Sequence, residues 1–182
     1  MIQHALLTAA DLTETELSAA VLDGELYRVG EGFRPIDLPL DAAARAASLR
    51  EILVHARVAA GPTAAWIWGA GDDPGTPYPV IVPRDSSVAH PSGVGSFLVT
   101  TRVMRLTPGE IIPLGGVPVT SALRTAMDLL CDEAWDYSPG VIDELVRLAG
   151  ADVATLAAEL RARSRLVGRG RALARLQVLV TR

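Results

Sequence analysis

The segment GVPVTSALRTAMDLL, from Gly116 to Leu130, joins an expected strand to an expected helix. The apolar run of the strand contains Pro118, which suits an edge or terminal position because proline has no N–H to donate to a ladder. Thr120 or Ser121 then offers a side-chain oxygen to the free N–H groups at the start of a helix. Apolar residues recur on one face of that helix and predict that it packs on the core. They are Leu123, Met127, Leu130 and Cys131.

Arg124 and Asp128 lie four residues apart on the same predicted helix, a spacing at which opposite charges pair. Arginine in a first helical turn opposes the helix dipole, so we expect Arg124 to have a specific partner. The segment is open to two interpretations, a functional site or a capped joint held by a structural ion pair. A catalytic site needs a base or a metal set nearby, and the sequence shows neither. We therefore expect a joint, with Thr120, Ser121, Arg124 and Asp128 as its structural fingerprint.

The N-terminal segment predicts a helix followed by a two-stranded ribbon. Thr13 suits the N-cap of a helix through ETELSAAVLDG, which Gly24 can end. The segment ELYRVGEGFRPI, residues 25–36, then has the alternation and central glycines of a hairpin. Helix, glycine and ribbon in this order are typical of the end of a winged helix-turn-helix. We therefore expect residues 1–38 to form a small, shortened winged-helix-like domain.

The remaining chain, residues 39–182, predicts an α/β domain with a small sheet and a helical C-terminal end. Helices are expected over 41–61, 62–71, 121–134, 139–149, 152–163 and 168–180. Strands are expected over 78–84 and 96–106, with one or two short strands in 109–120. The fold class predicted for the whole chain is α+β.

Composition excludes several classes of chemistry. All 17 basic residues are arginine, so a Walker A loop, a pyridoxal phosphate Schiff base and a lysine-dependent nuclease centre are excluded. The single cysteine, Cys131, excludes an internal disulfide framework and suits a reducing cytoplasm. The sequence has neither a signal-peptide pattern nor an apolar run long enough to span a bilayer. We expect a cytoplasmic protein without a membrane partner.

Motifs for catalysis and metal binding are weak. His4, His55 and His90 are too scattered for a metal site, and no Gly-x-Ser-x-Gly elbow occurs. The GVGS segment at 93–96 predicts a hairpin turn rather than a phosphate cradle. We expect no catalytic residues, no metal, no cofactor and no enzymatic activity.

Charge is unevenly distributed along the chain. Residues 1–37 hold two arginines and seven acids, whereas residues 161–182 hold seven arginines and no acid. A basic end on an acidic body indicates an anionic partner, either nucleic acid phosphate or an acidic protein, although a solvated helix face is the plain alternative. The candidate contacts are Arg161, Arg165, Arg169, Arg171 and Arg175, with Arg28 and Arg34 on the ribbon. Arg161, Arg165 and Arg169 are expected on one helical row because they are spaced by four.

The order of these motifs resembles the AbiEi family of type IV toxin–antitoxin antitoxins and related actinobacterial regulators. The matching pieces are DGELYRVGEGFRP, GPTAAWIWGAG, PVIVPR, the joint GVPVTSALRTAMDLL and the arginine-rich ELRARSRLVGRGRALARL. They extend over most of the chain, and the joint is the most specific of them. Some relatives carry a C-terminal nuclease-like domain, which we do not expect here.

The resemblance implies a winged helix that binds operator DNA, and a protein that represses its own operon and counters a nucleotidyltransferase toxin. Two features depart from that pattern. The expected recognition helix starts only thirteen residues into the chain, and it is acidic where DNA readout uses Arg, Lys, Asn or Gln. Two hypotheses follow: a non-enzymatic antitoxin-like regulator that binds DNA, a toxin or both, and a protein-interaction module with a decayed winged helix and no DNA binding.

Overall fold

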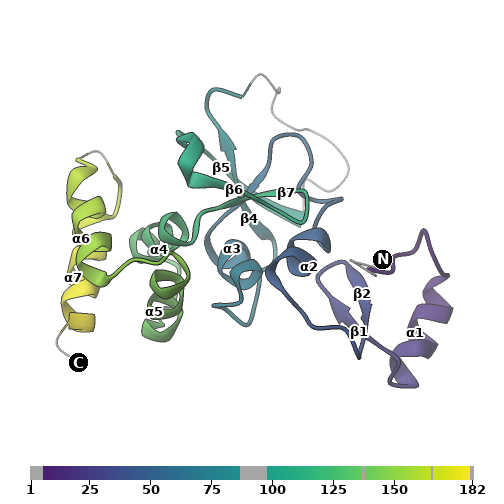
Figure 1. The fold of residues 1–182 in the computed structure, drawn as a ribbon. Coiled ribbons are helices and arrows are strands. Elements are labelled where there is room, and N and C mark those ends of the chain that lie inside the picture. The colour runs from purple at the N-terminus through teal and green to yellow at the C-terminus, as the bar shows by residue number, and fades with distance from the viewer. Residues whose placement is uncertain (1–5, 87–97, 137, 165, 181–182) are drawn as a thin grey trace.

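The chain has a mixed α+β fold with a helical C-terminal end, as predicted (Figure 1). The structure is a computed structural model and describes residues 6–86, 98–136, 138–164 and 166–180. The helices are α1 Glu14–Leu22, α2 Ala42–Ala47, α3 Gly61–Trp68, α4 Ala122–Cys131, α5 Pro139–Leu148, α6 Val153–Ala162 and α7 Arg169–Val180, with a 3-10 turn at Pro108–Glu110. The strands are β1 Leu26–Val29, β2 Gly32–Pro35, β3 Val58–Ala59, β4 Tyr78–Pro83, β5 Val99–Met104, β6 Ile111–Leu114 and β7 Val117–Thr120.

The N-terminal unit consists of α1 and the antiparallel ribbon β1–β2. Thr13 and Glu16 form a reciprocal capping box that satisfies two free N–H groups at the start of α1. Leu7 forms an isolated antiparallel β-bridge to the ribbon, since its N–H and carbonyl both bond to Phe33 of β2 at 2.8 and 2.9 Å. The predicted helix and ribbon are thus confirmed. In the described residues α1 is the only helix before the ribbon. The domain boundary at residue 38 stays a prediction.

The long helix predicted over residues 41–61 is wrong. α2 ends at Ala47, and His55 and Ala56 take positive φ values of 56° and 59° that no helix accommodates. Val58 and Ala59 then form β3 between β4 and β7. The apolar residues of this segment have helical spacing, but the chain buries them with turns followed by a strand. Periodicity alone does not distinguish a buried helix from such turns.

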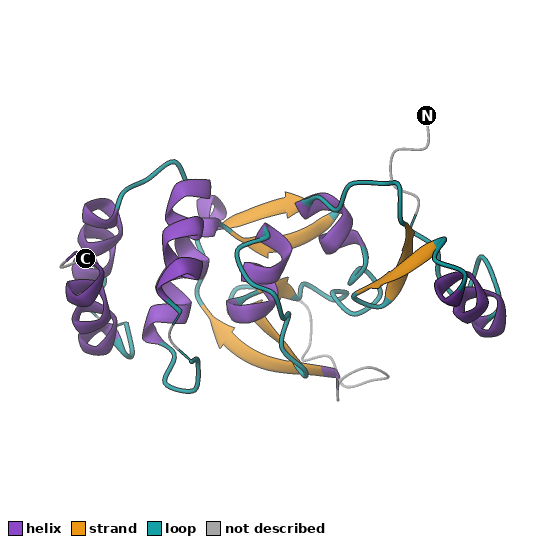
Figure 2. Ribbon diagram, turned by 90° about the horizontal axis from the view of Figure 1, so that it is seen from below, coloured by secondary structure: helices purple, strands orange, loops and turns teal. Residues whose placement is uncertain are grey.

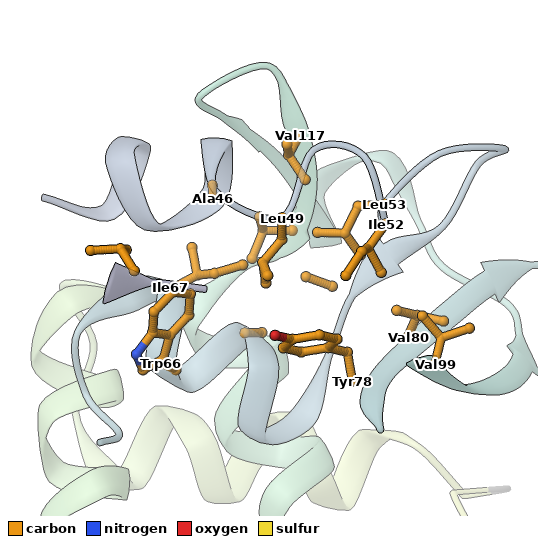
Figure 3. Close-up of a cluster of buried hydrophobic side chains, with 14 residues drawn as sticks. Ala46, Leu49, Ile52, Leu53, Trp66, Ile67, Tyr78, Val80, Val99 and Val117 are labelled. Carbon is orange, nitrogen blue, oxygen red and sulfur yellow. The ribbon is translucent and has the colours of Figure 1, made fainter. Parts of the chain in front are cut away.

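The central sheet has five strands in the order β5-β4-β3-β7-β6. The pairs β4–β5 and β3–β7 are parallel, whereas β3–β4 and β6–β7 are antiparallel. A first hydrophobic core fills the space between this sheet, α3 and the turns after α2 (Figure 3). It includes Leu49, Ile52, Ile67, Val80 and Val117. The Tyr78 hydroxyl donates to Glu31 Oε1 at 2.5 Å and so links the sheet to the tip of the ribbon.

A second hydrophobic core lies within α4–α7. The N-terminal unit and the α6–α7 pair lie at opposite ends of the molecule, with the sheet between them (Figure 2). Trp68 packs against both cores, and its indole Nε1 donates to the carbonyl of Thr120 at 2.9 Å. The described part of the chain holds no helix with the length and apolar character needed to cross a bilayer.

The joint between β7 and α4 is built much as the sequence indicates. Ser121 is the N-cap, and its hydroxyl accepts from the Arg124 N–H at 3.3 Å. Thr120 has a different role, because it is the last strand residue and its hydroxyl bonds to that of Thr125 at 2.8 Å. The turn before β7 requires glycine at Gly115, where φ is +55° and an added Cβ would lie 2.2 Å from the carbonyl oxygen of Ala43.

Candidate functional site

A buried cluster of charged side chains lies under the start of α4. Arg124 is 3% exposed, and its Nε donates to both carboxylate oxygens of Asp128 at 2.9 and 3.0 Å. Its Nη1 donates to Glu110 Oε1 at 2.9 Å, and the same oxygen accepts from Arg163 at 2.8 Å. The other Glu110 oxygen accepts from the Thr107 N–H at 2.7 Å. The predicted Arg124–Asp128 pair is confirmed, and it ties α4 to the 3-10 turn and to the end of α6.

The protonation equilibria of the cluster favour a charged Arg124–Glu110 pair. Burial opposes charge on Arg124, but Asp128 and Glu110 raise its pKa. Burial likewise opposes charge on Glu110, but its bonds to Thr107 and Arg124 hold its pKa below the ordinary value. Burial raises the pKa of Asp128 against the pull of Arg124. The Arg124 Nε–H contacts both Asp128 oxygens, at 2.9 and 3.0 Å, which is the geometry of a guanidinium paired with a carboxylate acceptor.

A cleft of about 800 Å³ opens beside this cluster. Its walls are β4 and β5, the connection from α4 to α5, and the connection from α6 to α7. Much of its lining is apolar, and Val103 and Val167 are 40% and 90% exposed, so part of that apolar surface faces solvent. The large apolar side chains of the lining are Val80, Ile81, Val103, Met104, Trp135, Leu166 and Val167.

Charged side chains surround the apolar part of the cleft. In the part of the chain that the structure describes, four carboxylates and two guanidinium groups line it: Asp128, Asp132, Glu133, Asp136, Arg102 and Arg171. Arg102 pairs with Asp132 at 3.0 Å, and Arg171 pairs with Glu133 at 2.9 Å. In each pair one partner is largely exposed, Arg102 at 59% and Glu133 at 84%, whereas Asp132 is only 19% exposed. The Arg171–Glu133 pair therefore contributes about 0–1 kcal/mol. Asp136 is exposed and has no ion-pair partner among the described residues.

Cys131 lies in the cleft wall but is poorly placed for nucleophilic chemistry. Burial, followed by the charge of Asp128, raises the pKa of its thiol to about 11. The thiolate, which is the reactive form, is therefore scarce at neutral pH. Within the described residues, no group of three or more His, Cys, Asp and Glu side chains is placed to hold a metal ion. The arrangement is suited to recognition by apolar contact and charge.

Two of the arginines predicted to contact a partner donate hydrogen bonds to the protein's own backbone. Arg175 Nη1 donates to the carbonyls of Leu129, Leu130 and Asp132 at 3.3, 3.0 and 2.8 Å. Arg171 donates to the carbonyl of Cys131 at 2.9 Å in addition to its pair with Glu133. These bonds reach carbonyl groups in the last turn of α4 and just beyond it, where helical N–H donors run out, although the Leu129 carbonyl also accepts from the Asp132 N–H. Both arginines thus hold α7 against the end of α4.

The predicted helical row of Arg161, Arg165 and Arg169 is wrong. α6 ends at Ala162, and Gly168 takes a φ of +80° immediately before α7 begins at Arg169. An added Cβ at Gly168 would lie 2.3 Å from the carbonyl oxygen of Cys131, so this close approach requires glycine and breaks the helix. Arg161 is exposed and Arg169 half-buried, and Arg165 lies outside the described residues, as does the GVGS segment at 93–96.

The two ribbon arginines have different environments. Arg28 is exposed, and its guanidinium lies 5.9 Å from the centre of the Phe33 ring. Arg34 is 4% exposed, and its Nη2 donates to the carbonyl of Pro39 at 2.7 Å. Its Nε and Nη1 are buried without a hydrogen-bond partner among the described residues. Of the two, only Arg28 presents its charge to solvent.

The sequence interpretation missed the acidic side of the cleft. Asp128, Asp132, Glu133 and Asp136 fall within nine residues, and no arginine occurs between Arg124 and Arg147. This local excess of acid was the available signal. Its juxtaposition with β5 and the α6–α7 connection carried no sequence signal, because those segments are far apart in the chain.

Comparison with known proteins gives a weak structural likeness. No family model matches the chain, and no curated protein matches its sequence. A crystal structure of the RV2827C protein from Mycobacterium tuberculosis resembles it with 15% sequence identity and a TM-score of 0.38, over 99% of this chain and 77% of that one. A TM-score at this level carries no argument about function.

Proposed function

We propose that the protein is a non-enzymatic, cytoplasmic regulator of the AbiEi antitoxin type that acts by binding a partner protein, the cognate nucleotidyltransferase toxin. The order of sequence motifs is the basis for the family. The open cleft of about 800 Å³ beside the buried ion pairs is the observation that carries the protein-binding role. Its size falls in the range of recognition sites, and its exposed apolar lining has the character of an interaction surface.

The contacts of the C-terminal arginines support a protein partner over DNA. Arg163, Arg171 and Arg175 bind carboxylates or backbone carbonyls of the same chain. A phosphate would have to compete with these contacts, which leaves less positive charge for DNA than the sequence count indicates. Asp136, which has no ion-pair partner among the described residues of the cleft, would also repel a nucleic acid backbone.

Operator binding through the ribbon is a second candidate function. The order of α1, β1 and β2, with the β-bridge from Leu7 to Phe33 of β2, supports a wing-like unit. Arg28 is exposed on that ribbon and available to a phosphate. Against this stands the acidic character of α1, where Glu14 and Glu16 occupy the first turn.

Binding measurements with both partners distinguish the two candidates. The purified chain is titrated calorimetrically with the protein encoded by the adjacent gene, and by mobility shift with its own upstream DNA, each over a salt series. The proposal predicts a protein complex with a Kd of about 10 μM or tighter. Salt-sensitive DNA binding that Arg28→Glu abolishes and Arg169→Glu leaves unchanged, with no protein complex, would establish the second candidate instead. Binding to neither would refute both.

A further inference from the structure

The cleft beside α4 combines three features that together select a class of ligand. Its lining has solvent-exposed apolar side chains, with Val103 on β5 and Val167 before α7. The acidic end of α4 and the connection that follows it form one wall, and Trp135 lies within that wall. Among the described residues of the lining, carboxylates outnumber guanidinium groups by four to two, and one of the four, Asp128, is paired with Arg124 from beneath. These features combine apolar contact with an excess of negative charge.

We infer that the cleft binds a segment of a partner protein in which arginine or lysine side chains alternate with large apolar ones. This inference rests on the proposed function and specifies the chemistry of its partner. The apolar side chains of such a segment would cover Val103 and Val167. Its cations would face Asp136 and Glu133, whose side chains are exposed at the rim. Charge complementarity of this kind steers association and selects against acidic partners.

The exposed ion pairs of the cleft give a partner cation places to bind. Asp132 is held by Arg102 and Glu133 by Arg171, and each guanidinium is more than one third exposed. Glu133 is 84% exposed, and because exposed pairs of this type are weak, an incoming guanidinium can take over its carboxylate at small cost. Asp132 is 19% exposed and becomes a partner only where Arg102 gives it up. Asp136 needs no such exchange, because none of the described residues pairs with it. Asp136 is therefore the first position at which a partner cation is expected.

Buried charge beneath the cleft keeps its acidic wall in place. Arg124 fixes Asp128 near the end of α4, and Arg175 binds the carbonyl of Asp132 at 2.8 Å. The wall is thus preorganised, which lowers the entropic cost of binding. A site that is already formed is expected to bind even a short segment, so synthetic peptides are adequate probes.

The test uses two fluorescein-labelled peptides of equal length, one alternating arginine with leucine and the other alternating glutamate with leucine. Fluorescence anisotropy measures their binding to the full chain. The arginine peptide is expected to bind with a Kd of about 10–100 μM, and the glutamate peptide at least about tenfold more weakly. Equal binding of both peptides, or no binding of the arginine peptide at about 1 mM, would overturn the inference.

Charge-reversal variants locate the binding site. Asp136→Arg is expected to weaken binding of the arginine peptide at least about tenfold. Asp143→Arg, which reverses an exposed acid of α5 outside the cleft lining, is the matched control and should change it less than about twofold. Equal losses of peptide affinity in the two variants would show that only the total charge of the protein sets the affinity, and would overturn the cleft as the binding site. Circular dichroism checks that both variants are folded.

A neutralising variant tests the exchange of ion pairs. Arg102→Gln frees Asp132 for the peptide and is expected to tighten binding about threefold or more. Arg147→Gln removes the same charge from an exposed pair on α5 and should have little effect. Equal effects of the two variants would contradict the exchange.

The inference and the proposed function fail in different ways. If the adjacent-gene protein binds the chain and Asp136→Arg leaves that affinity unchanged, the proposed function stands and the cleft is not its site. If the arginine peptide binds as expected and the adjacent-gene protein does not, the chemistry of the cleft stands and the proposed partner is wrong. If a second copy of this chain occupies the cleft, sedimentation will show dimers. That result would overturn the inference that the cleft binds a different protein.

Discussion

Removal of the Arg124 guanidinium should destabilise the protein more than any exposed charge substitution. Arg124→Met keeps the approximate length of the side chain but leaves Asp128, 12% exposed, without its main cation. Glu110 retains Arg163 and the Thr107 N–H, so Asp128 bears most of the loss. Breaking a buried pair by deleting one partner costs about 3–5 kcal/mol. For a chain of this size that corresponds to a decrease in Tm of about 6–20 °C.

Urea denaturation followed by circular dichroism measures this change in the free energy of unfolding. Arg147→Met is the control, since its pair with Glu144 is exposed and should cost less than about 1 kcal/mol. The double variant Arg124→Met/Asp128→Leu should recover more than half of the loss, because it removes the unpaired charge. The reasoning is refuted if Arg124→Met costs no more than the control, or if the double variant is less stable than Arg124→Met alone.

Three further predictions concern the same region. The pKa of Glu110 is lowered from its ordinary 4.5, so its carboxylate stabilises the folded state at pH values above 4.5 and loses that contribution as the pH falls. In urea titrations the free energy of unfolding of wild type should therefore exceed that of Glu110→Gln by less and less below about pH 4.5. A difference that does not depend on pH would contradict this. Arg175→Met should lower the free energy of unfolding by about 2–3 kcal/mol in urea denaturation, because three carbonyls at the end of α4 lose their charged donor. The control Arg161→Met should lower it by less than about 0.5 kcal/mol. Equal losses would argue against the capping role of Arg175. Burial raises the pKa of the Cys131 thiol from its ordinary 9.0 to about 11. Iodoacetamide at pH 8 should therefore alkylate Cys131 about a hundredfold more slowly than a cysteine peptide. Equal rates would show that the thiol is not shielded.

The sequence predicted the elements whose apolar pattern and caps agree. α4, α5, α6 and α7 were found within a few residues because each has a helical apolar face. α1 was found from its N-cap at Thr13, and the ribbon from its central glycines. The failure at residues 41–61 arose because Leu49, Ile52 and Leu53 have helical spacing but are buried by turns that lead into β3. Only the tertiary packing distinguishes those two arrangements.

The candidate site was harder to predict than the fold. The Arg124–Asp128 pair follows from spacing within one helix. Glu110 joins the pair from another segment. Its capping box with Thr107 uses one carboxylate oxygen, and nothing in the local sequence indicates that the other oxygen of Glu110 reaches Arg124. The arginine-rich end misled for a related reason, since a count of charges does not show that Arg171 and Arg175 donate to backbone carbonyls forty and more residues away. Long-range hydrogen bonds of this kind leave no local pattern.

Hydrogen exchange of the complex with the adjacent-gene protein tests the central claim most directly. Mass spectrometry compares deuterium uptake of the free chain with that of the chain at saturating partner. The account predicts slower exchange in residues 99–104 of β5 and in residues 131–136, from the last residue of α4 onward, with the ribbon at 26–35 unchanged. Protection confined to residues 26–35, with β5 and the end of α4 exchanging as in the free chain, would contradict it.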